Sequence, residues 1–209
     1  MNDSSHDIGQ TQESHMAPGL ATAPCFRRGT GVKLCSRGSR VNTLKTLHLM
    51  RHAKSAWDEP GLADRARGLN KRGRRDAPRM GAALATELLP QAIAVSPARR
   101  AQLTLAGLCA GWPALAACDH VTEESLYTFG ADELRHWITA LNDEQSSVFI
   151  IGHNPALTEL VNTLLGQWQL DNLPTAGYAR LSLSIDRWSG LKAGCGQLDR
   201  LLIPRELPD

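Results

Sequence analysis

From Thr46 onward, short apolar runs alternate with longer segments of helical pattern, and this alternation constrains the fold more than any other feature of the chain. Such alternation is typical of βαβ units, in which helices connect the parallel strands of one sheet. It predicts strands at residues 47–50, 92–95 and 147–151, each followed by a helix, at residues 72–89, 97–109 and 155–165. The sequence therefore predicts an α/β fold of three layers (α/β/α), with a mostly parallel central sheet.

The last part of the chain adds strands to this sheet. Residues 178–186 alternate between apolar and polar side chains with a period of two, which is typical of a strand with one buried face. Residues 197–204 form another apolar run, and residues 132–141 have the pattern of a short helix. We expect one α/β domain over residues 44–209.

Residues 1–43 differ from the rest of the chain in composition. They are rich in Ser, Gly, Thr, Pro and Arg and have no sustained apolar period. A segment of this kind cannot bury enough apolar surface to offset the entropy lost on folding. We expect it to be a flexible leader without a fold of its own.

Composition excludes several classes of protein. The net charge of +2 is too small to indicate a nucleic-acid surface, and no apolar run approaches the roughly 20 residues of a spanning helix. The cysteines form neither a CxxC pair nor a dense framework, which argues against zinc ribbons and disulfide scaffolds. These cysteines are Cys25, Cys35, Cys109, Cys118 and Cys195. We expect a cytoplasmic protein without a metal, another cofactor, a nucleic-acid partner or a membrane partner.

Cationic and imidazole side chains follow three of the predicted strands. Arg51 and His52 come directly after the first apolar run. Arg100 lies shortly after the second run, and His153 follows the third. Because parallel strands end at one edge of a sheet, where α/β proteins bind ligands, these four side chains are expected to converge.

Two of these strand ends also carry helix-start signals. Ser96 before Pro97, and Asn154 before Pro155, are typical of a capping residue followed by the first helical residue. Arg100 then lies about one turn into its helix, beside the positive end of the helix dipole, which favours an anion.

Two guanidinium groups and two imidazoles make a site for phosphate. Guanidinium forks bind phosphate oxygens in pairs, and an imidazole can attack phosphorus and leave again. No carboxylate cluster for a metal accompanies these residues in the sequence. The combination predicts phosphoryl transfer through a phosphohistidine, with arginine and histidine neutralising the charge that magnesium neutralises in kinases.

Four short segments resemble the motifs of the histidine phosphatase superfamily, the phosphoglycerate-mutase-like proteins, and within it the SixA-like phosphohistidine phosphatases. They are "LMRHAKS", "LNKRGRRDA", "SPARRAQLT" and "IIGHNP", in the order and with the spacing of the family. The resemblance covers about residues 46–204. It implies a phosphoglycerate-mutase-like fold and a cofactor-independent phosphatase.

The resemblance also implies a role for each converging residue. His52 would be the nucleophile that becomes phosphorylated, with Arg51 beside it as a phosphate ligand. Arg100 would be the second phosphate arginine, because Arg100 rather than Arg99 precedes alanine in the family's Ser-Pro-x-x-Arg-Ala register. His153 would be the second histidine of the pocket and would donate to phosphate oxygens.

The proton donor is the least defined part of this prediction. Mutases and many ester phosphatases of the family supply a glutamate, and the segment "TEESLY" offers Glu124 or, as the alternative, Glu123. An imidazole leaving group, with a pKa of about 6.5, needs less help from an acid than an alkoxide does. The preferred substrate is therefore phosphohistidine in a phosphorylated protein. The alternatives are small phosphate esters, or a phosphate-binding module without turnover.

Overall fold

The computed structural model describes residues 44–58 and 60–207. The expected leader, residues 1–43, lies outside this part, so the leader and its boundary stay predictions. The strands are β1 (Lys45–Arg51), β2 (Ile93–Val95), β3 (Val121–Thr122), β4 (Ser147–Gly152), β5 (Tyr178–Leu183) and β6 (Gly196–Leu202). The α-helices are α1 (Lys71–Ala85), α2 (Arg99–Gly111), α3 (Ala131–Thr139) and α4 (Ala156–Leu165). Two short 3₁₀ helices also border the site, η1 (Asp64–Ala66) and η3 (Glu124–Leu126).

The strands form one sheet in the order β3-β2-β4-β1-β5-β6. β4 is parallel to both β1 and β2, and β2 is parallel to β3. β5 is antiparallel to β1 and to β6. The prediction of a mostly parallel sheet with extra strands from the last part of the chain is confirmed. The carboxyl ends of β1, β2 and β4 consequently lie at one edge.

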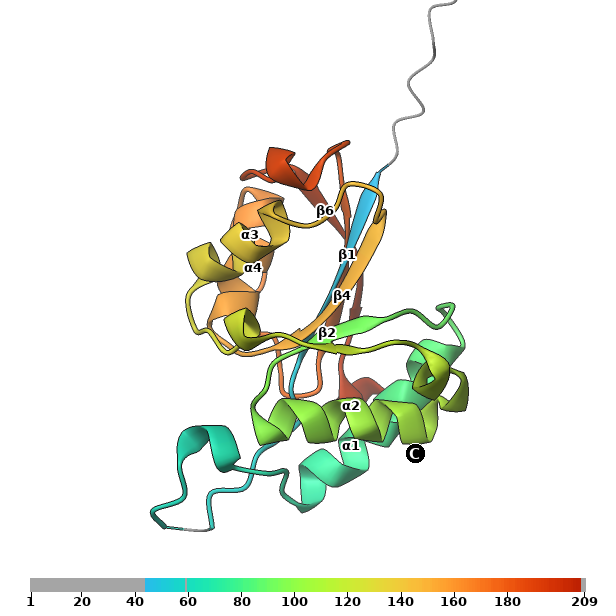
Figure 1. Cartoon of the computed structure of the whole chain (residues 1–209), viewed down its shortest axis with the longest axis vertical. Helices are drawn as coiled ribbons and strands as arrows, with labels where there is room; N and C mark the ends of the chain where they lie inside the picture. The colour runs from blue at the N-terminus through green and yellow to red at the C-terminus, as the bar shows by residue number, and fades with distance from the viewer. Residues whose placement is uncertain (1–43, 59, 208–209) are drawn as a thin grey trace, which may run out of the picture. The chain divides into compact units, whose positions relative to one another are not determined.

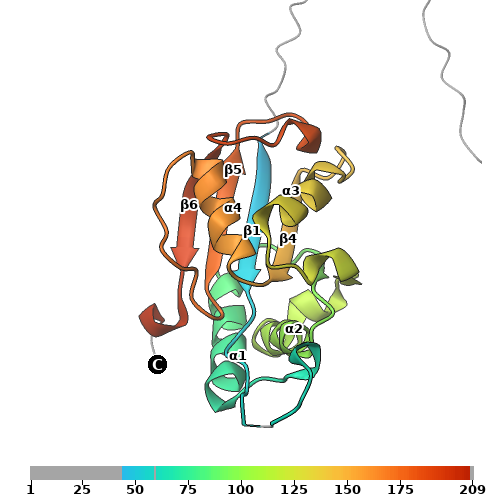
Figure 2. The ribbon, with the colours of Figure 1, turned by 90° about the vertical axis from the view of Figure 1, so that its left-hand side faces the viewer.

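Helices cover both faces of this sheet, as Figures 1 and 2 show. Successive side chains of a strand point to opposite faces, so Leu49 packs in the core with α3 and α4, whereas Met50 packs in the core with α1 and α2. Ile150 and Ile151 of β4 divide in the same way. The three-layer architecture is confirmed. No helix in the described part of the chain is long and apolar enough to cross a membrane.

The predicted start of α2 is wrong by two residues. The helix begins at Arg99, and the side chain of Ser96 does not cap it. The Ser96 hydroxyl instead lies 2.7 Å from Nε2 of His153 and accepts from the backbone N–H of Ala98 at 3.3 Å. The bond from Ala98 lies in the turn that precedes Arg99, so it does not cap α2.

Asn154 is likewise not the cap of α4, which begins at Ala156. Its amide nitrogen donates to Oδ1 of Asn172 at 2.8 Å and to the carbonyl of Leu173 at 3.1 Å. The side chain therefore ties the loop after β4 to the loop before β5.

The start of α1 supports the loop that follows β1. Asn70 caps α1 by accepting from the backbone N–H of Gly73 at 2.9 Å, and its own N–H donates to the Lys54 carbonyl at 3.0 Å. A Cβ atom at Gly73 would lie 2.3 Å from that same carbonyl oxygen, so only glycine allows this approach. The "LNKRG" segment therefore presses α1 against the backbone just beyond His52.

Candidate active site

His52 lies just beyond β1, buried, and its hydrogen bonds assign its proton. Nδ1 lies 2.8 Å from the carbonyl oxygen of Ala53, which can only accept, so Nδ1 carries the hydrogen. Arg100 donates from Nε to Nε2 at 3.2 Å, so Nε2 holds the lone pair. Burial, above all, lowers the pKa of His52 to about 4, and the charge of Arg100 acts in the same direction against the bond to Ala53. The ring is therefore neutral at pH 7, with Nε2 available as a nucleophile.

The backbone around His52 is held by one strand, β4, and one helix, α2. The N–H of His52 donates to the carbonyl of Gly152 at the end of β4, at 3.1 Å. The N–H of Ala53 donates to Oγ1 of Thr104 at 2.9 Å, and that hydroxyl donates to the carbonyl of Arg100 at 2.7 Å. The buried threonine that ends the "SPARRAQLT" segment thus connects α2 to the nucleophile's neighbour.

His153 follows β4, and its ring centroid lies 5.0 Å from that of His52. Its Nδ1 lies 3.3 Å from Nη2 of Arg100, which can only donate, and its Nε2 lies 2.7 Å from Oγ of Ser96. Nδ1 is therefore the acceptor, and Nε2–H donates to the serine. Burial, followed by the neighbouring His52 and Arg100, lowers the pKa of His153 to about 3.

Arg100 connects the two histidines, as the register of the "SPARRAQLT" segment predicts. Its side chain is 3% exposed and donates toward both imidazoles, whereas Arg99 is exposed. Because consecutive helical residues point about 100° apart, only one of these two arginines can face the strand ends. The structure brings Arg100, His52 and His153 together.

Two further guanidinium groups lie at the site with unused donors. Arg51 donates from Nη1 to Asn172 and to the Leu173 carbonyl, at 3.1 and 2.9 Å, but its Nε is buried without a partner among the described residues. Arg67 has a buried Nη1 that also lacks a partner in this part of the chain, and its guanidinium lies 3.5 Å from the centre of the Trp57 ring. Buried donors without partners are costly, so both groups favour an anion at this place.

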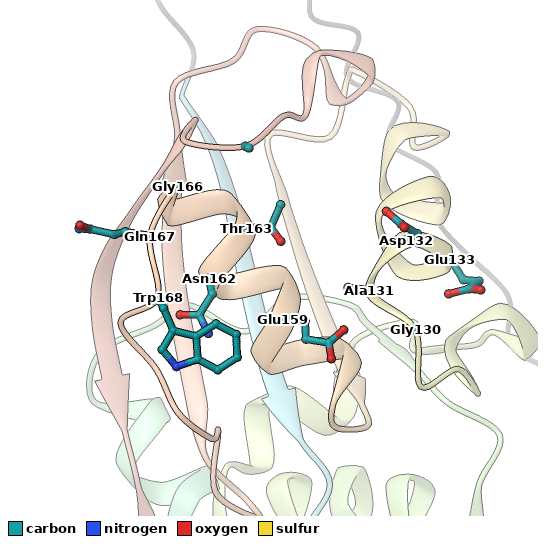
Figure 3. Close-up of a pocket in the computed structure, with 11 residues that line it drawn as sticks. Gly130, Ala131, Asp132, Glu133, Glu159, Asn162, Thr163, Gly166, Gln167 and Trp168 are labelled. Atoms are coloured by element: carbon teal, nitrogen blue, oxygen red, sulfur yellow. The ribbon is translucent and has the colours of Figure 1, made fainter.

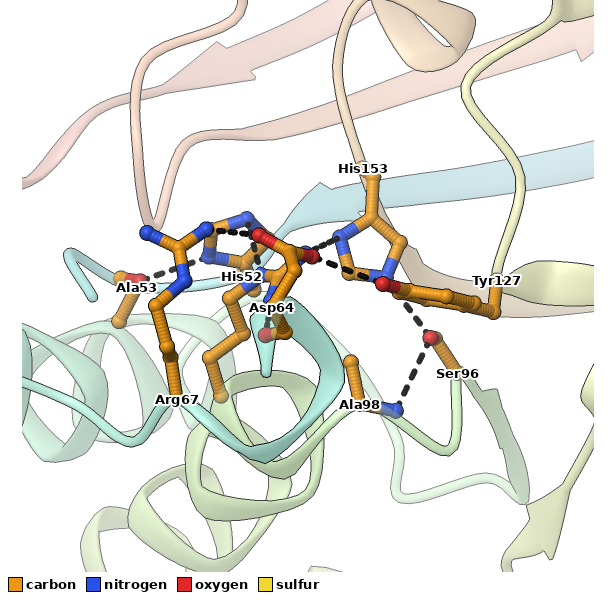
Figure 4. A network of polar contacts seen from close by, with 9 residues as sticks. His52, Ala53, Asp64, Arg67, Ser96, Ala98, Tyr127 and His153 are labelled. Atoms are coloured by element: carbon orange, nitrogen blue, oxygen red, sulfur yellow. Dashed lines mark hydrogen bonds and ion pairs between the residues drawn. The ribbon is translucent and has the colours of Figure 1, made fainter. Parts of the chain in front are cut away.

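Asp64 and Tyr127 were missed by the sequence analysis. Asp64, in η1, accepts from Nη2 of Arg100 and from the Tyr127 hydroxyl, each at 2.8 Å, and Figure 4 shows its carboxylate pointing toward the two histidine rings. The edge of the Tyr127 ring packs against His153, with centroids 5.5 Å apart. The segment around Asp64 has no apolar period, so nothing in its sequence pattern indicated that it folds back onto the strand ends.

Glu124 contacts Arg65 rather than either of the two imidazoles. Its carboxylate binds Nη2 of Arg65 at 2.6 Å, and its side chain is 71% exposed. Glu123 precedes η3, and its backbone N–H donates to the Val95 carbonyl at 3.0 Å. Neither glutamate has a hydrogen bond to His52 or His153 in the described structure. The role of Glu124 as a proton donor stays a prediction.

A hollow of about 810 Å³ lies elsewhere, between α3 and α4 (Figure 3). Its charged lining residues are acidic: Asp132, Glu133 and Glu159. Three carboxylates repel a phosphate dianion, so size alone does not identify the phosphate site. Within the described residues, no three His, Cys, Asp or Glu side chains are placed to hold a metal ion together.

Comparison with known proteins agrees with this geometry. The profile of the histidine phosphatase superfamily (branch 1) matches residues 47–127, which include His52, Arg100 and the intervening "LNKRG" segment. The SixA protein of Agrobacterium tumefaciens, which is named as a phosphohistidine phosphatase, is 28% identical, with a TM-score of 0.65 over 77% of this chain and 98% of that chain. The match places residues 47–127 in the histidine phosphatase superfamily, and the fold of the chain is SixA-like.

Two further matches cover the same part of the chain. A protein histidine phosphatase SixA solved with tungstate has a TM-score of 0.61 and 23% identity, over 77% of this chain and 97% of that chain, which shows a shared fold. An uncharacterized protein of Mycobacterium leprae is 29% identical over 168 residues, 75% of this chain and the whole of the relative. Superfamily membership supports a phosphatase reaction, and it confirms the resemblance seen in the sequence segments.

Proposed function

We propose that this chain is a cofactor-independent phosphatase in which His52 is the nucleophile, and that its substrates are proteins phosphorylated on histidine. The observation that carries the proposal is the protonation state of His52. Its Nδ1–H is bound to the Ala53 carbonyl, and its Nε2 lone pair lies 3.2 Å from a guanidinium nitrogen of Arg100. A nucleophile needs an unprotonated nitrogen beside the group that binds the electrophile's charge.

The arginines and His153 form the proposed phosphate cradle. Arg100 binds phosphate oxygens from the second residue position of α2, and the unpartnered Arg51 Nε and Arg67 Nη1 supply further donors. A bound dianion favours the protonated form of His153, whose Nδ1 then donates to a phosphate oxygen. Charge neutralisation and positioning are the main contributions a protein makes to phosphoryl transfer.

The reaction has two balanced steps. First, Nε2 of His52 forms a bond to phosphorus while the P–N bond to the substrate imidazole breaks, and the leaving imidazole takes up a proton from solvent. Second, a water oxygen bonds to phosphorus, and the P–Nε2 bond breaks with its electron pair returning to His52. Inorganic phosphate leaves with both protons of that water. The Nδ1–H bond to Ala53 keeps the ring oriented through both steps.

The surroundings of Asp64, the carboxylate at the two histidines, and of Glu124, the predicted acid, favour phosphohistidine over phosphate esters. Desolvation would raise the pKa of Asp64, but hydrogen bonds from Tyr127, Arg100 and Arg67 outweigh it and lower the pKa to about 2. Asp64 is therefore ionised at pH 7, and Glu124 is paired with Arg65. An alkoxide needs a proton donor that contributes about 10²–10⁴-fold, whereas imidazole does not need a strong one. The absence of nucleic-acid and membrane partners, and a cytoplasmic location, stay predictions.

The test compares substrates on the purified full chain. Phosphate release is measured from a histidine-phosphorylated carrier protein and from a panel of small phosphate esters, with His52→Ala as the control. We expect rapid release from the carrier and an acid-labile phosphoenzyme that His52→Ala does not form. Preference for an ester would return Glu124 to the mechanism, and tungstate binding without any release would identify a phosphate-binding module.

A further inference from the structure

The carboxylate of Asp64 lies among the donors that the proposed reaction needs for phosphate. Oδ2 accepts from Nη2 of Arg100 and from the Tyr127 hydroxyl, each at 2.8 Å, and Oδ1 accepts from Nη2 of Arg67. The backbone carbonyl of Asp64 accepts from Nη1 of Arg100 at 2.7 Å. Both terminal nitrogens of Arg100 are therefore engaged by a single acidic residue.

This carboxylate and a phosphoryl group need the same donors. A guanidinium binds a carboxylate and a phosphate with the same forked geometry. The Nη2 that holds Asp64 also lies 3.3 Å from His153 Nδ1, and Nε of the same group lies 3.2 Å from the nucleophilic Nε2 of His52. A phosphoryl group placed for attack by His52 must take over at least one of these arginine donors.

The segment that carries Asp64 is attached mainly by polar contacts. η1 is three residues long and has no buried residue, and the Asp64 side chain is 43% exposed. Segments with few buried apolar contacts open at low free-energy cost. The partners of the carboxylate, by contrast, are anchored: Arg100 is buried in α2, and Tyr127 packs on His153. Displacement by an anion would therefore move Asp64 rather than Arg100.

We propose that Asp64 is an internal competitor for the phosphate site: in the ligand-free chain its carboxylate holds Arg100, Arg67 and Tyr127, and the phosphoryl group of the substrate displaces it. This inference rests on the proposed function, because it assumes that phosphate binds at Arg100 beside His52. It makes Asp64 a determinant of specificity. A tethered carboxylate outcompetes singly charged anions, whereas a phosphoryl dianion brings a second charge and additional oxygens for the unused donors of Arg51 and Arg67.

Tungstate, a tetrahedral dianion, tests the proposal on the full chain. Its dissociation constant is measured by calorimetry in a buffer free of other oxyanions, for the wild type and for Asp64→Asn. Removing the competing charge should tighten tungstate binding by about tenfold. The matched control is Asp132→Asn, which removes the same charge from an exposed position on α3 and should change the constant by less than about twofold.

Weaker binding by Asp64→Asn would overturn the proposal, because it would show that the carboxylate positions Arg100 for the anion instead of competing with it. Failure of both wild type and variant to bind tungstate would count against the proposed function itself. Binding by the variant alone would support the competitor role.

Thermal unfolding of Asp64→Asn and Asp64→Ala gives a second, independent readout. Without tungstate, both variants should melt below the wild type, because the charge of Arg100 loses its partner in a buried place. With saturating tungstate, the rise in melting temperature should be larger in the variants than in the wild type. A smaller rise in both variants would contradict competition and would assign Asp64 to positioning.

Discussion

His48 lies in β1 and His52 lies just beyond its end, so the two histidines can be compared directly. Both are buried, at 4% and 8% exposure, both lie on the face covered by α1 and α2, and burial lowers the pKa of each to about 4. Nδ1 of His48 pairs with the Tyr178 hydroxyl at 2.7 Å, and its ring stacks on Phe149. The polar neighbours of His52 are instead a backbone carbonyl and Arg100. Burial and pKa are therefore shared, and each ring has an arginine nearby, because Arg180 of β5 lies opposite His48. What distinguishes His52 is that Arg100 donates directly to its Nε2, which makes this histidine the one suited to bind and attack an anion.

The largest expected difference between the two histidines is in turnover. His52→Ala removes the proposed nucleophile and should lower phosphate release by at least about 10³-fold. Its circular dichroism spectrum and melting curve should show a folded protein, because the ring contributes little to either hydrophobic core. Substantial residual turnover would exclude His52 as the attacking group and would undo the contrast with His48.

Stability at acid pH should depend on His48, as it does on the other buried histidines. The unfolded chain binds the proton near pH 6.5 and the folded chain only near pH 4, so folding stability falls as the pH drops through this interval and the contribution levels off below it. The loss assigned to His48 is about 3 kcal/mol. Denaturant unfolding between pH 7 and 4 should show a shallower pH dependence for His48→Asn than for the wild type.

The matched control for this measurement is His136→Asn, which removes a histidine from an exposed position on α3. An equally shallow pH dependence in this control would mean that burial of His48 is not the cause. Phosphatase activity of His48→Asn at pH 7 should stay within a few-fold of the wild type, because His48 contacts Tyr178 and Phe149 rather than the phosphate cradle.

The contribution of the Arg100 charge at His52 can be separated from the effect of removing any arginine from the start of α2. Arg100→Ala should weaken tungstate binding by about 10–100-fold, the cost of losing charged hydrogen bonds in a buried site. Arg99→Ala, one residue earlier on α2 and exposed, should change binding by less than about threefold. Equal losses would mean that the two arginines contribute only a general positive potential.

The smallest expected effect concerns the pKa values themselves. NMR titration of the imidazole Cε1–H signals should give midpoints near pH 4 for both His48 and His52. In Arg100→Ala the midpoint of His52 should move up toward its ordinary value, because a neighbouring positive charge is lost, while that of His48 stays in place. A common shift of both would indicate a change in packing rather than the loss of one charge.

Much of the site could be predicted from sequence because strand ends obey a simple geometric rule. Arg51, His52, Arg100 and His153 follow strands that are parallel, so their positions at one edge followed from the alternation of elements. The choice of Arg100 over Arg99 followed from the family register, and the structure places Arg100 at the histidines.

Other parts could not be read from sequence, because they depend on contacts between segments with no periodic pattern. Asp64 and Tyr127 meet at 2.8 Å across 63 residues of chain, and no local pattern encodes such a pairing. Ser96 carried the signal of a helix cap, but its hydroxyl binds His153, and α2 begins at Arg99 instead. The backbone bond that this hydroxyl accepts, from Ala98, lies in the turn before the helix.

The amino-acid sequence by itself determined most of the strands and helices along the chain, though not β3, and the identity of the converging arginines and histidines, because hydrophobic periodicity and motif spacing are local properties. Only the tertiary structure decided which imidazole nitrogen carries a proton, which guanidinium donors are free and which carboxylate occupies them. Those outcomes depend on hydrogen-bond distances between groups that are far apart along the chain, and a shift of about 1 Å is enough to change them.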